Sequence, residues 1–224
     1  MRHTGFVQLV VTTRPDLAAA DRIAFRLRDA VRRRGSASLG LSGGSTAPAL
    51  IEALIAETVP WSDVTIWQVD ERVAPDGDEQ RNANQLVAFD ELPCRIRPMP
   101  VTAADLRAAA RRYAVGLPGR FDVIHLGIGD DGHTASWPPD EPGIRDSERA
   151  VEIVSEFHGV PRMTLTRRVV NEARSRVVYA VGASKRPVIE RWLLDDRSLP
   201  ISHVRSAWTS VFLDAAAAPA VPLQ

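Results

Sequence analysis

The stretch FDVIHLGIGDDGHTAS, residues 121–136, decides the fold of this chain. Its first six residues, Phe121–Leu126, are mostly apolar and predict a short buried strand. Glycine and aspartate follow at once, which is typical of a strand that ends in a tight loop. The same pattern, a short apolar strand followed by a turn rich in Gly, Asp or Ser, recurs along the chain between helical segments.

The clearest helical spacing of apolar residues runs over Pro15–Arg34, and Gly35 ends it. Alternating strands and helices predict an α/β fold, a Rossmann-like open and mainly parallel sheet with helices on both faces. We expect one domain over residues 1–224, with a frayed tail at about 215–224. The predicted strands are 6–11, 38–41, 64–69, 121–126, 151–154, 176–181 and 208–213, and the predicted helices are 15–34, 48–57, 82–89, 103–115, 166–173 and 184–194.

Composition restricts the possible functions. Lys plus Arg and Asp plus Glu number 28 each, which argues against a protein that binds nucleic-acid phosphates with a basic face. No apolar run approaches the roughly 20 residues of a membrane span, and the N-terminus lacks a signal-peptide pattern. The single cysteine, Cys94, excludes an intramolecular disulfide and a multi-cysteine zinc site. We therefore expect a cytoplasmic enzyme with no nucleic-acid partner and no membrane contact.

Ligands of open parallel sheets bind outside the carboxyl ends of the strands, and polar clusters fall at these positions. The first cluster follows the strand 38–41 and opens a helix, so its backbone N–H groups suit a phosphate. The alternative is a tight turn with a Ser/Thr helix cap. No Gly-Lys-Ser/Thr follows, so a nucleotide P-loop is not indicated. The cluster consists of Gly43, Gly44, Ser45 and Thr46.

The same stretch matches the G-x-S-x-G nucleophile elbow over Gly40–Gly44, which would make Ser42 a nucleophile. Only one or two strands precede it, whereas the elbow of α/β-hydrolases follows several.

The second cluster is Asp70-Glu71-Arg72 at the end of the strand 64–69. It suits a sugar and its anionic group, although a solvated charged turn is the common alternative.

The third cluster, 127–136, contains G-x-G-x-x-G after a strand, so a dinucleotide must be considered, with Glu152 at about the expected distance. Two acidic residues in the loop and two prolines soon after it oppose that interpretation. The loop instead places Asp131 two residues before His133, and such a histidine suits a general base acting on water. His125 is interpreted as a core histidine.

The fourth cluster supplies two cations, Arg162 and Lys185, that suit an anion. Lys185 is the only lysine, and it lies in the first turn of a predicted helix, where the helix dipole disfavours a cation unless an anion is near. His3, His158 and His203 have no convincing partners in the sequence, and no metal-ligand spacing such as H-x-x-x-H with carboxylates occurs. We expect no metal and no cofactor.

Together these clusters resemble the 6-phosphogluconolactonase family, within the wider superfamily of glucosamine-6-phosphate deaminases. The resemblance implies a Rossmann-like fold, hydrolysis of 6-phosphogluconolactone to 6-phosphogluconate in the pentose phosphate pathway, and neither metal nor nucleotide. His133 falls on the family's catalytic histidine, and Asp70 on the acidic position that the deaminases use as a base. The motifs are LSGGST at 41–46, VDER at 69–72, RNANQ at 81–85, GIGDDGHTAS at 127–136, RMTLT at 162–166 and GASK at 182–185.

Two residues depart from the family pattern. Asp130 replaces the proline common before D-G-H, and Arg81 replaces a serine. We expect His133 to activate water with Asp131, Asp70 and Arg72 beside it, and the phosphate to bind residues 43–46, Arg162 and Lys185. The alternatives are a glucosamine-6-phosphate deaminase or isomerase and a non-enzymatic sugar-phosphate sensor. The sequence does not determine the oligomeric state.

Overall fold

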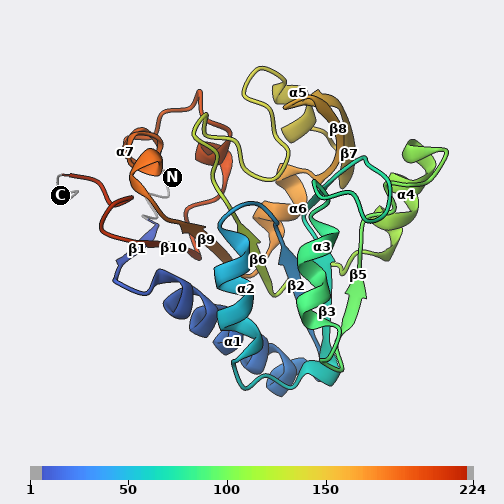
Figure 1. Cartoon of the computed structure of the whole chain (residues 1–224), viewed down its shortest axis with the longest axis horizontal. Coiled ribbons are helices and arrows are strands. Elements are labelled where there is room, and N and C mark those ends of the chain that lie inside the picture. The colour runs from blue at the N-terminus through green and yellow to red at the C-terminus, as the bar shows by residue number, and fades with distance from the viewer. Residues whose placement is uncertain (1–6, 221–224) are drawn as a thin grey trace.

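The structure, a computed structural model, describes residues 7–220 and contains two sheets with helices packed around them (Figure 1). Every hydrogen-bonded pair of strands in the larger sheet is parallel, which confirms the predicted open parallel α/β fold. The strand order across this sheet is β1 (Gln8–Val11), β10 (Thr209–Leu213), β9 (Arg176–Ala180), β6 (Val123–Leu126), β2 (Ala37–Leu41), β3 (Val64–Gln68) and β5 (Arg95–Arg97).

The middle of the sheet, where β2 and β6 are neighbours, is its topological switch point (Figure 1). From β2 the chain proceeds to β3 and β5 on one side, and from β6 it proceeds to β9 and β10 on the other. The loops that leave the carboxyl ends of β2 and β6 therefore diverge and leave a crevice between them. Both loops are polar clusters that we predicted from the sequence.

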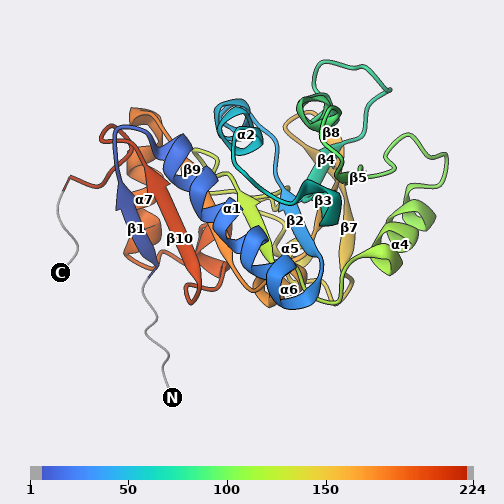
Figure 2. The same cartoon turned by 90° about the horizontal axis from the view of Figure 1, so that it is seen from below.

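The two faces of the large sheet are covered differently. Helices α1 (Pro15–Arg34) and α2 (Ala47–Ile55) cover one face, and Figure 2 shows α1 lying across the strands. Ile23, Ala24 and Leu27 of α1 are completely buried, as their helical spacing predicts. The other face carries α4 (Leu106–Gly116), α6 (Arg167–Glu172), α7 (Arg186–Leu193) and the second sheet. The prediction of helices alone on both faces is thus incomplete.

The second sheet, which the sequence analysis missed, is antiparallel and consists of β4 (Asp70–Arg72), β8 (Val160–Leu165) and β7 (Val151–Phe157). We predicted a strand only at 151–154 and none at 160–165. The chain passes from one sheet to the other at Val69, whose N–H donates to Leu41 O and whose carbonyl accepts from Leu165 N. This transfer is a long-range contact, which no local sequence pattern specifies.

Several predicted boundaries shift, one of them because of capping. The helix expected from residue 103 begins at Leu106, since the side chain of Asp105 caps it by accepting from Ala108 N. The segment 82–89 is a short helix, α3 (Ala83–Leu86), with a 3₁₀ turn, and 184–194 likewise begins with a 3₁₀ turn before α7. One further short helix, α5, spans Pro142–Arg145.

The frayed tail predicted from residue 215 is wrong for its first half. Ala217 is fully buried, and the Ala220 N–H donates to the Glu190 carboxylate of α7 at 3.0 Å. These contacts fix the segment on the helix.

Residues 221–224, and likewise Phe6 and His3, lie outside the described residues. In the described part of the chain, no helix combines the length and the apolarity that crossing a membrane requires.

One buried carboxylate joins the start of β2 to the start of β6. Asp122 Oδ2 accepts from the backbone N–H of Ser38 at 2.9 Å and from its hydroxyl at 3.1 Å, and Asp122 Oδ1 pairs with Arg34 at 2.6 Å. We expect Asp122→Ala to lower the free energy of unfolding by about 1–3 kcal/mol, because it leaves a buried N–H without an acceptor. Urea unfolding at pH 7 measures this change.

The control is Asp63→Ala, which removes an exposed carboxylate that forms no ion pair among the described residues. Its effect should stay within about 0.5 kcal/mol. Equal effects of the two substitutions would contradict the structural role of Asp122.

Candidate active site

Nine of the ten predicted site residues line one pocket of about 210 Å³ at the switch point. They come from the loops after β2 and β6, from the small sheet and from the start of α7, so segments far apart in the sequence meet there. The tenth residue, Asp131, lies behind His133 and contacts it. The nine are Gly43, Gly44, Ser45, Thr46, Asp70, Arg72, His133, Arg162 and Lys185.

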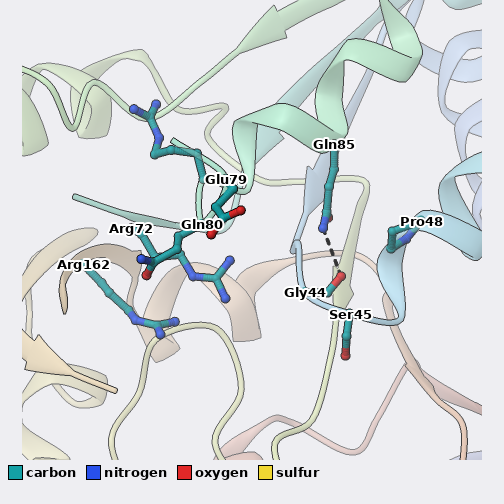
Figure 3. A pocket seen from close by; sticks show the side chains of 9 residues that line it. Gly44, Ser45, Pro48, Arg72, Glu79, Gln80, Gln85 and Arg162 are labelled. Atoms are coloured by element: carbon teal, nitrogen blue, oxygen red, sulfur yellow. Dashed lines mark hydrogen bonds between the residues drawn. The ribbon is translucent and has the colours of Figure 1, made fainter. Parts of the chain in front are cut away.

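The loop after β2 presents backbone N–H groups to this pocket. No side chain caps the N-terminus of α2 at Thr46. The Ala47 N–H donates to the Gly44 carbonyl and Pro48 has no N–H, so the N–H groups that an anion could use are those of the loop residues 44–46, which have no acceptor among the described residues. A side chain at Gly43 would collide with Asn82, which explains why only glycine fits at this position. Gln85 Nε2 donates to the carbonyl of Gly44 at 3.1 Å and holds the loop from its outer side (Figure 3).

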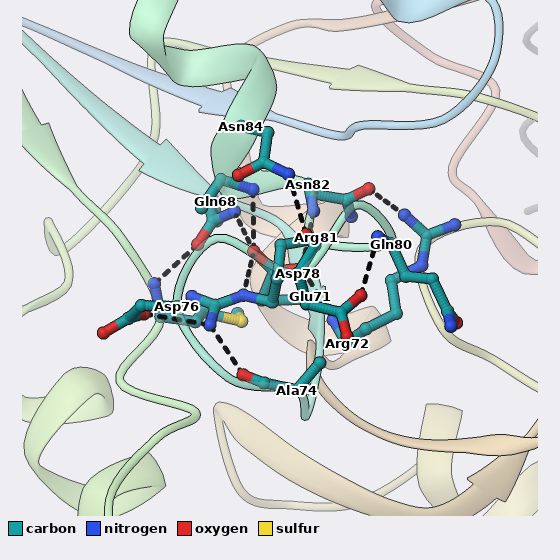
Figure 4. A network of polar contacts seen from close by, with 12 residues as sticks. Gln68, Glu71, Arg72, Ala74, Asp76, Asp78, Gln80, Arg81, Asn82 and Asn84 are labelled. Carbon is teal, nitrogen blue, oxygen red and sulfur yellow. Dashed lines mark hydrogen bonds and ion pairs between the residues drawn. The ribbon is translucent and has the colours of Figure 1, made fainter.

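The two carboxylates of the Asp-Glu-Arg motif have different environments. Glu71 is completely buried and accepts hydrogen bonds from Arg72 N and Asn82 N on Oε1, and from Gln68 Nε2 and Ala83 N on Oε2 (Figure 4). Arg81, which replaces the serine of the family pattern, is also buried and pairs with Glu71 at 3.1 Å. All the acceptor positions of Glu71 are thus used within the protein, which makes Glu71 a structural residue.

Asp70, in contrast, lies in the pocket wall. Its Oδ2 accepts a 2.7 Å hydrogen bond from the Ser136 hydroxyl. Burial raises the pKa of Asp70, and this effect exceeds the opposing contributions of Ser136, Arg162 and Arg72. The carboxylate keeps acceptor capacity for a hydroxyl group of a ligand.

Two arginines face each other across the small sheet. Arg72 of β4 and Arg162 of β8 are cross-strand partners, and Figure 3 shows both side chains entering a neighbouring pocket of about 270 Å³ opposite Ser45. Like charges in this position repel, and burial lowers the pKa of Arg162. Among the described residues neither guanidinium forms an ion pair, since Arg72 donates to the Asn82 amide and Arg162 to the Phe157 carbonyl. A bound anion between them would neutralise both.

The Asp131–His133 pair has the geometry of an activated base. Asp131 Oδ1 lies 2.5 Å from His133 Nδ1 and also accepts from the His133 backbone N–H at 3.0 Å. Burial alone would raise the pKa of Asp131, but the hydrogen bonds from His133 outweigh it and bring the pKa down to about 2. An ionised carboxylate only accepts hydrogen bonds, so Nδ1 carries a proton, and in the neutral tautomer Nε2 is the nitrogen with the free lone pair.

Glycines shape the loop around this pair. A Cβ at Gly129 would collide with the His133 ring, and Gly132 has φ +84°. His133 also packs edge-on against Phe157, with ring centroids 5.0 Å apart. The imidazole is therefore held between the loop and the tip of the β7–β8 hairpin.

Lys185 has a partner that the sequence analysis did not assign. Its Nζ pairs with Asp130 Oδ1 at 2.7 Å, at the end of the 3₁₀ turn that precedes α7. Asp130, the departure from the family pattern, therefore contacts the lysine, and Asp131 is the carboxylate that contacts His133. The cation lies in the pocket wall beside a carboxylate that is 66% exposed.

Two alternatives lose support. A nucleophilic serine needs a base within hydrogen-bond reach, but the buried Ser42 hydroxyl has no partner among the described residues. A dinucleotide loop needs a helix at its end, but turns follow Gly132 up to α5. His125 is buried, and burial lowers its pKa to about 4, which agrees with a core histidine.

Four further residues contact the site that were not predicted from the sequence. Asn82 accepts a hydrogen bond from Arg72, and Ser136 donates one to Asp70. Asn82 and Ser136 both lie within the motifs that carried the family resemblance. Phe157 packs on His133, and His158 Nε2 lies 3.7 Å from Asp131 Oδ2, so His158 does have a partner. No sequence signal indicated these two, because the hairpin that places them was not predicted.

Comparisons with known proteins agree with this geometry. A 6-phosphogluconolactonase of Streptomyces coelicolor is 34% identical over 96% of this chain and 95% of its own length. One of Synechocystis is 34% identical over 73% of this chain and 74% of its own length. A crystal structure of a 6-phosphogluconolactonase from Shewanella baltica, 26% identical, has a TM-score of 0.83 and covers 96% of this chain and 100% of that one.

The family model described as glucosamine-6-phosphate isomerases/6-phosphogluconolactonase matches residues 16–212, which include the pocket residues of both sheets. The sequence resemblance to this family is thus confirmed. The chain belongs to the glucosamine-6-phosphate isomerase/6-phosphogluconolactonase family.

Proposed function

We propose that this chain is a 6-phosphogluconolactonase, which hydrolyses 6-phospho-D-glucono-1,5-lactone to 6-phospho-D-gluconate in the pentose phosphate pathway, and that His133 activates the water. The observation that carries the proposal is the Asp131–His133 pair at the rim of an arginine-lined pocket. The curated relatives named 6-phosphogluconolactonase support the lactonase activity over the isomerase activity of the same family.

The phosphate of the substrate occupies the space between residues 43–46 and the facing pair Arg72 and Arg162. The loop N–H groups before α2 and the two guanidinium groups, neither of which forms an ion pair among the described residues, support this position. Lys185 exchanges Asp130 for the phosphate when the substrate binds. Asp70 accepts a hydrogen bond from a sugar hydroxyl and so orients the ring.

Hydrolysis then follows from the position of His133. Nε2 removes a proton from water, and the water oxygen bonds to the lactone carbonyl carbon. Arg162, Arg72 or loop N–H groups stabilise the oxyanion that forms. When the bond between this carbon and the ring oxygen breaks, the imidazolium returns its proton to the ring oxygen, and the product acid ionises. Binding of the remote phosphate provides the orientation for this step.

The chemistry assigned to these residues requires no cofactor and no nucleic-acid partner. The cytoplasmic location expected from the sequence stays a prediction. So does the single-domain assignment, and so do the individual roles of the site residues.

His133→Ala should lower kcat by roughly 10²–10⁴-fold, the usual contribution of a general base, with the fold retained. Steady-state kinetics on the phosphorylated lactone, corrected for spontaneous hydrolysis, measure the effect. Ser42→Ala is the matched control and should matter much less. If Ser42→Ala abolishes activity instead and a serine-directed reagent labels Ser42, the nucleophile-elbow mechanism is correct.

The phosphate of the substrate should be required. We expect kcat/KM for the phosphorylated lactone to exceed that for gluconolactone by about 10²-fold or more, since a buried charged contact is worth about 2–5 kcal/mol. Comparable kcat/KM values on the two lactones would contradict the assignment of the phosphate site. Ammonia release from glucosamine 6-phosphate would support the deaminase alternative.

Lys185→Ala should raise KM about tenfold or more, with a smaller effect on kcat, because it removes a phosphate contact. Lys185→Arg should restore only part of the affinity, since a planar guanidinium does not replace a compact ammonium. Asp130→Ala is the matched control: it removes the ion-pair partner but keeps the ammonium. A KM that stays unchanged in Lys185→Ala would show that this lysine does not bind the phosphate.

A further inference from the structure

Three metal-ligating side chains meet at the rim of the site. Asp131 and His133 lie in the loop after β6, and His158 lies at the tip of the β7–β8 hairpin. One ligand atom from each of the three lies within 4.8 Å of the other two. Asp131 is the shared neighbour, 2.5 Å from His133 Nδ1 through Oδ1 and 3.7 Å from His158 Nε2 through Oδ2.

The hairpin turn places His158 beside the loop after β6. His158 and Gly159 form a two-residue turn between the paired residues Phe157 and Val160, with φ of +53° and +80°. Turns with two positive φ values favour Asn-Gly, and histidine is one of the non-glycine residues that adopt positive φ more often than most. The turn therefore accommodates His158, and it brings the imidazole to 3.7 Å from the Asp131 carboxylate.

The ring of Phe157 holds the two imidazoles next to each other. Its centroid is 5.0 Å from that of His133 and 4.2 Å from that of His158, and the two imidazole centroids are 5.3 Å apart. Other charges border the cluster. Arg162 stacks on the same phenylalanine at 5.0 Å, and Asp130 is already paired with Lys185. With neutral imidazoles, the cluster itself carries one negative charge.

Two imidazoles and one carboxylate are a ligand set that zinc accepts, with the fourth position left to water. Tetrahedral bonds of about 2.0–2.1 Å require ligand atoms about 3.3 Å apart. The two contacts of Asp131, 2.5 Å and 3.7 Å, lie on either side of that value. Seating one ion would require the His133 and Asp131 ligand atoms to move apart and His158 to move closer to the carboxylate.

We propose that Asp131, His133 and His158 bind a divalent transition-metal ion such as Zn²⁺, and that this ion inhibits the enzyme reversibly. The ion engages the carboxylate and the imidazole of the water-activating pair, and binding releases the proton from any ring nitrogen that becomes a ligand. The site is inhibitory because His133 loses its role as a base. The inhibition, unlike the binding itself, rests on the role of His133 proposed above.

The test uses His158→Asn, which removes the imidazole but keeps a turn sequence, Asn-Gly, that suits the backbone. Because His158 contacts Asp131, the metal-free activity of the variant is measured first, and inhibition by zinc is expressed relative to the zinc-free rate of each protein. Zinc titrations of both proteins, by calorimetry and by lactone hydrolysis, give affinity and inhibition separately. We expect zinc to inhibit the unmodified chain, EDTA to reverse the inhibition, and His158→Asn to weaken both binding and inhibition at least about tenfold.

The matched control is His203→Asn, since His203 Nε2 donates to the Arg197 carbonyl and His203 lies outside the cluster. It should leave zinc binding unchanged. Equal zinc affinity in His158→Asn and the unmodified chain would overturn the proposal, as would zinc that binds without inhibiting an active lactonase. If zinc binds in a His158-dependent way but no lactone hydrolysis is found, the metal site stands and the proposed function fails.

Discussion

The buried carboxylate of Glu71 is the interaction on which the architecture of the site depends. A charge without solvent is costly unless hydrogen bonds and an opposite charge surround it, and Glu71 has four N–H donors and Arg81. Two of these donors, the N–H groups of Asn82 and Ala83, lie beyond a polar loop. By drawing that loop back onto β4, the carboxylate places Asn82 beside the glycine loop and orients Arg72.

The two sheets contribute different chemistry to the pocket. The large parallel sheet ends in two glycine-rich loops, which supply backbone N–H groups and the Asp131–His133 pair. The small antiparallel sheet supplies Asp70 and the facing arginines. Because the sheets join at Val69, the side chains of one are held in fixed register against the loops of the other. This rigid junction is what a site needs to hold a substrate and a base in one geometry.

Repulsion inside the pocket is a consequence of that arrangement. Two guanidinium groups face each other without an ion pair among the described residues, and the ammonium of Lys185 is satisfied by an exposed carboxylate. In the proposed function, the phosphate of the substrate supplies the negative charge that pairs with these cations. The hairpin that carries Arg162 also brings Phe157 and His158 against His133. One element therefore contributes a cation to the pocket and forms part of the surroundings of His133.

The sequence by itself determined the α/β class, the long helix Pro15–Arg34 and the polar clusters at strand ends, because these follow from local periodicity and from turn residues. It also identified nine residues that line one pocket. Only the tertiary structure decided that Glu71 is structural while Asp70 faces the pocket, that Asp130 pairs with Lys185, and that His158 has a partner. The small sheet pairs strands about 90 residues apart, such as Arg72 with Arg162. Pairing over such distances depends on the packed fold, because no local pattern encodes which distant strand supplies the partner.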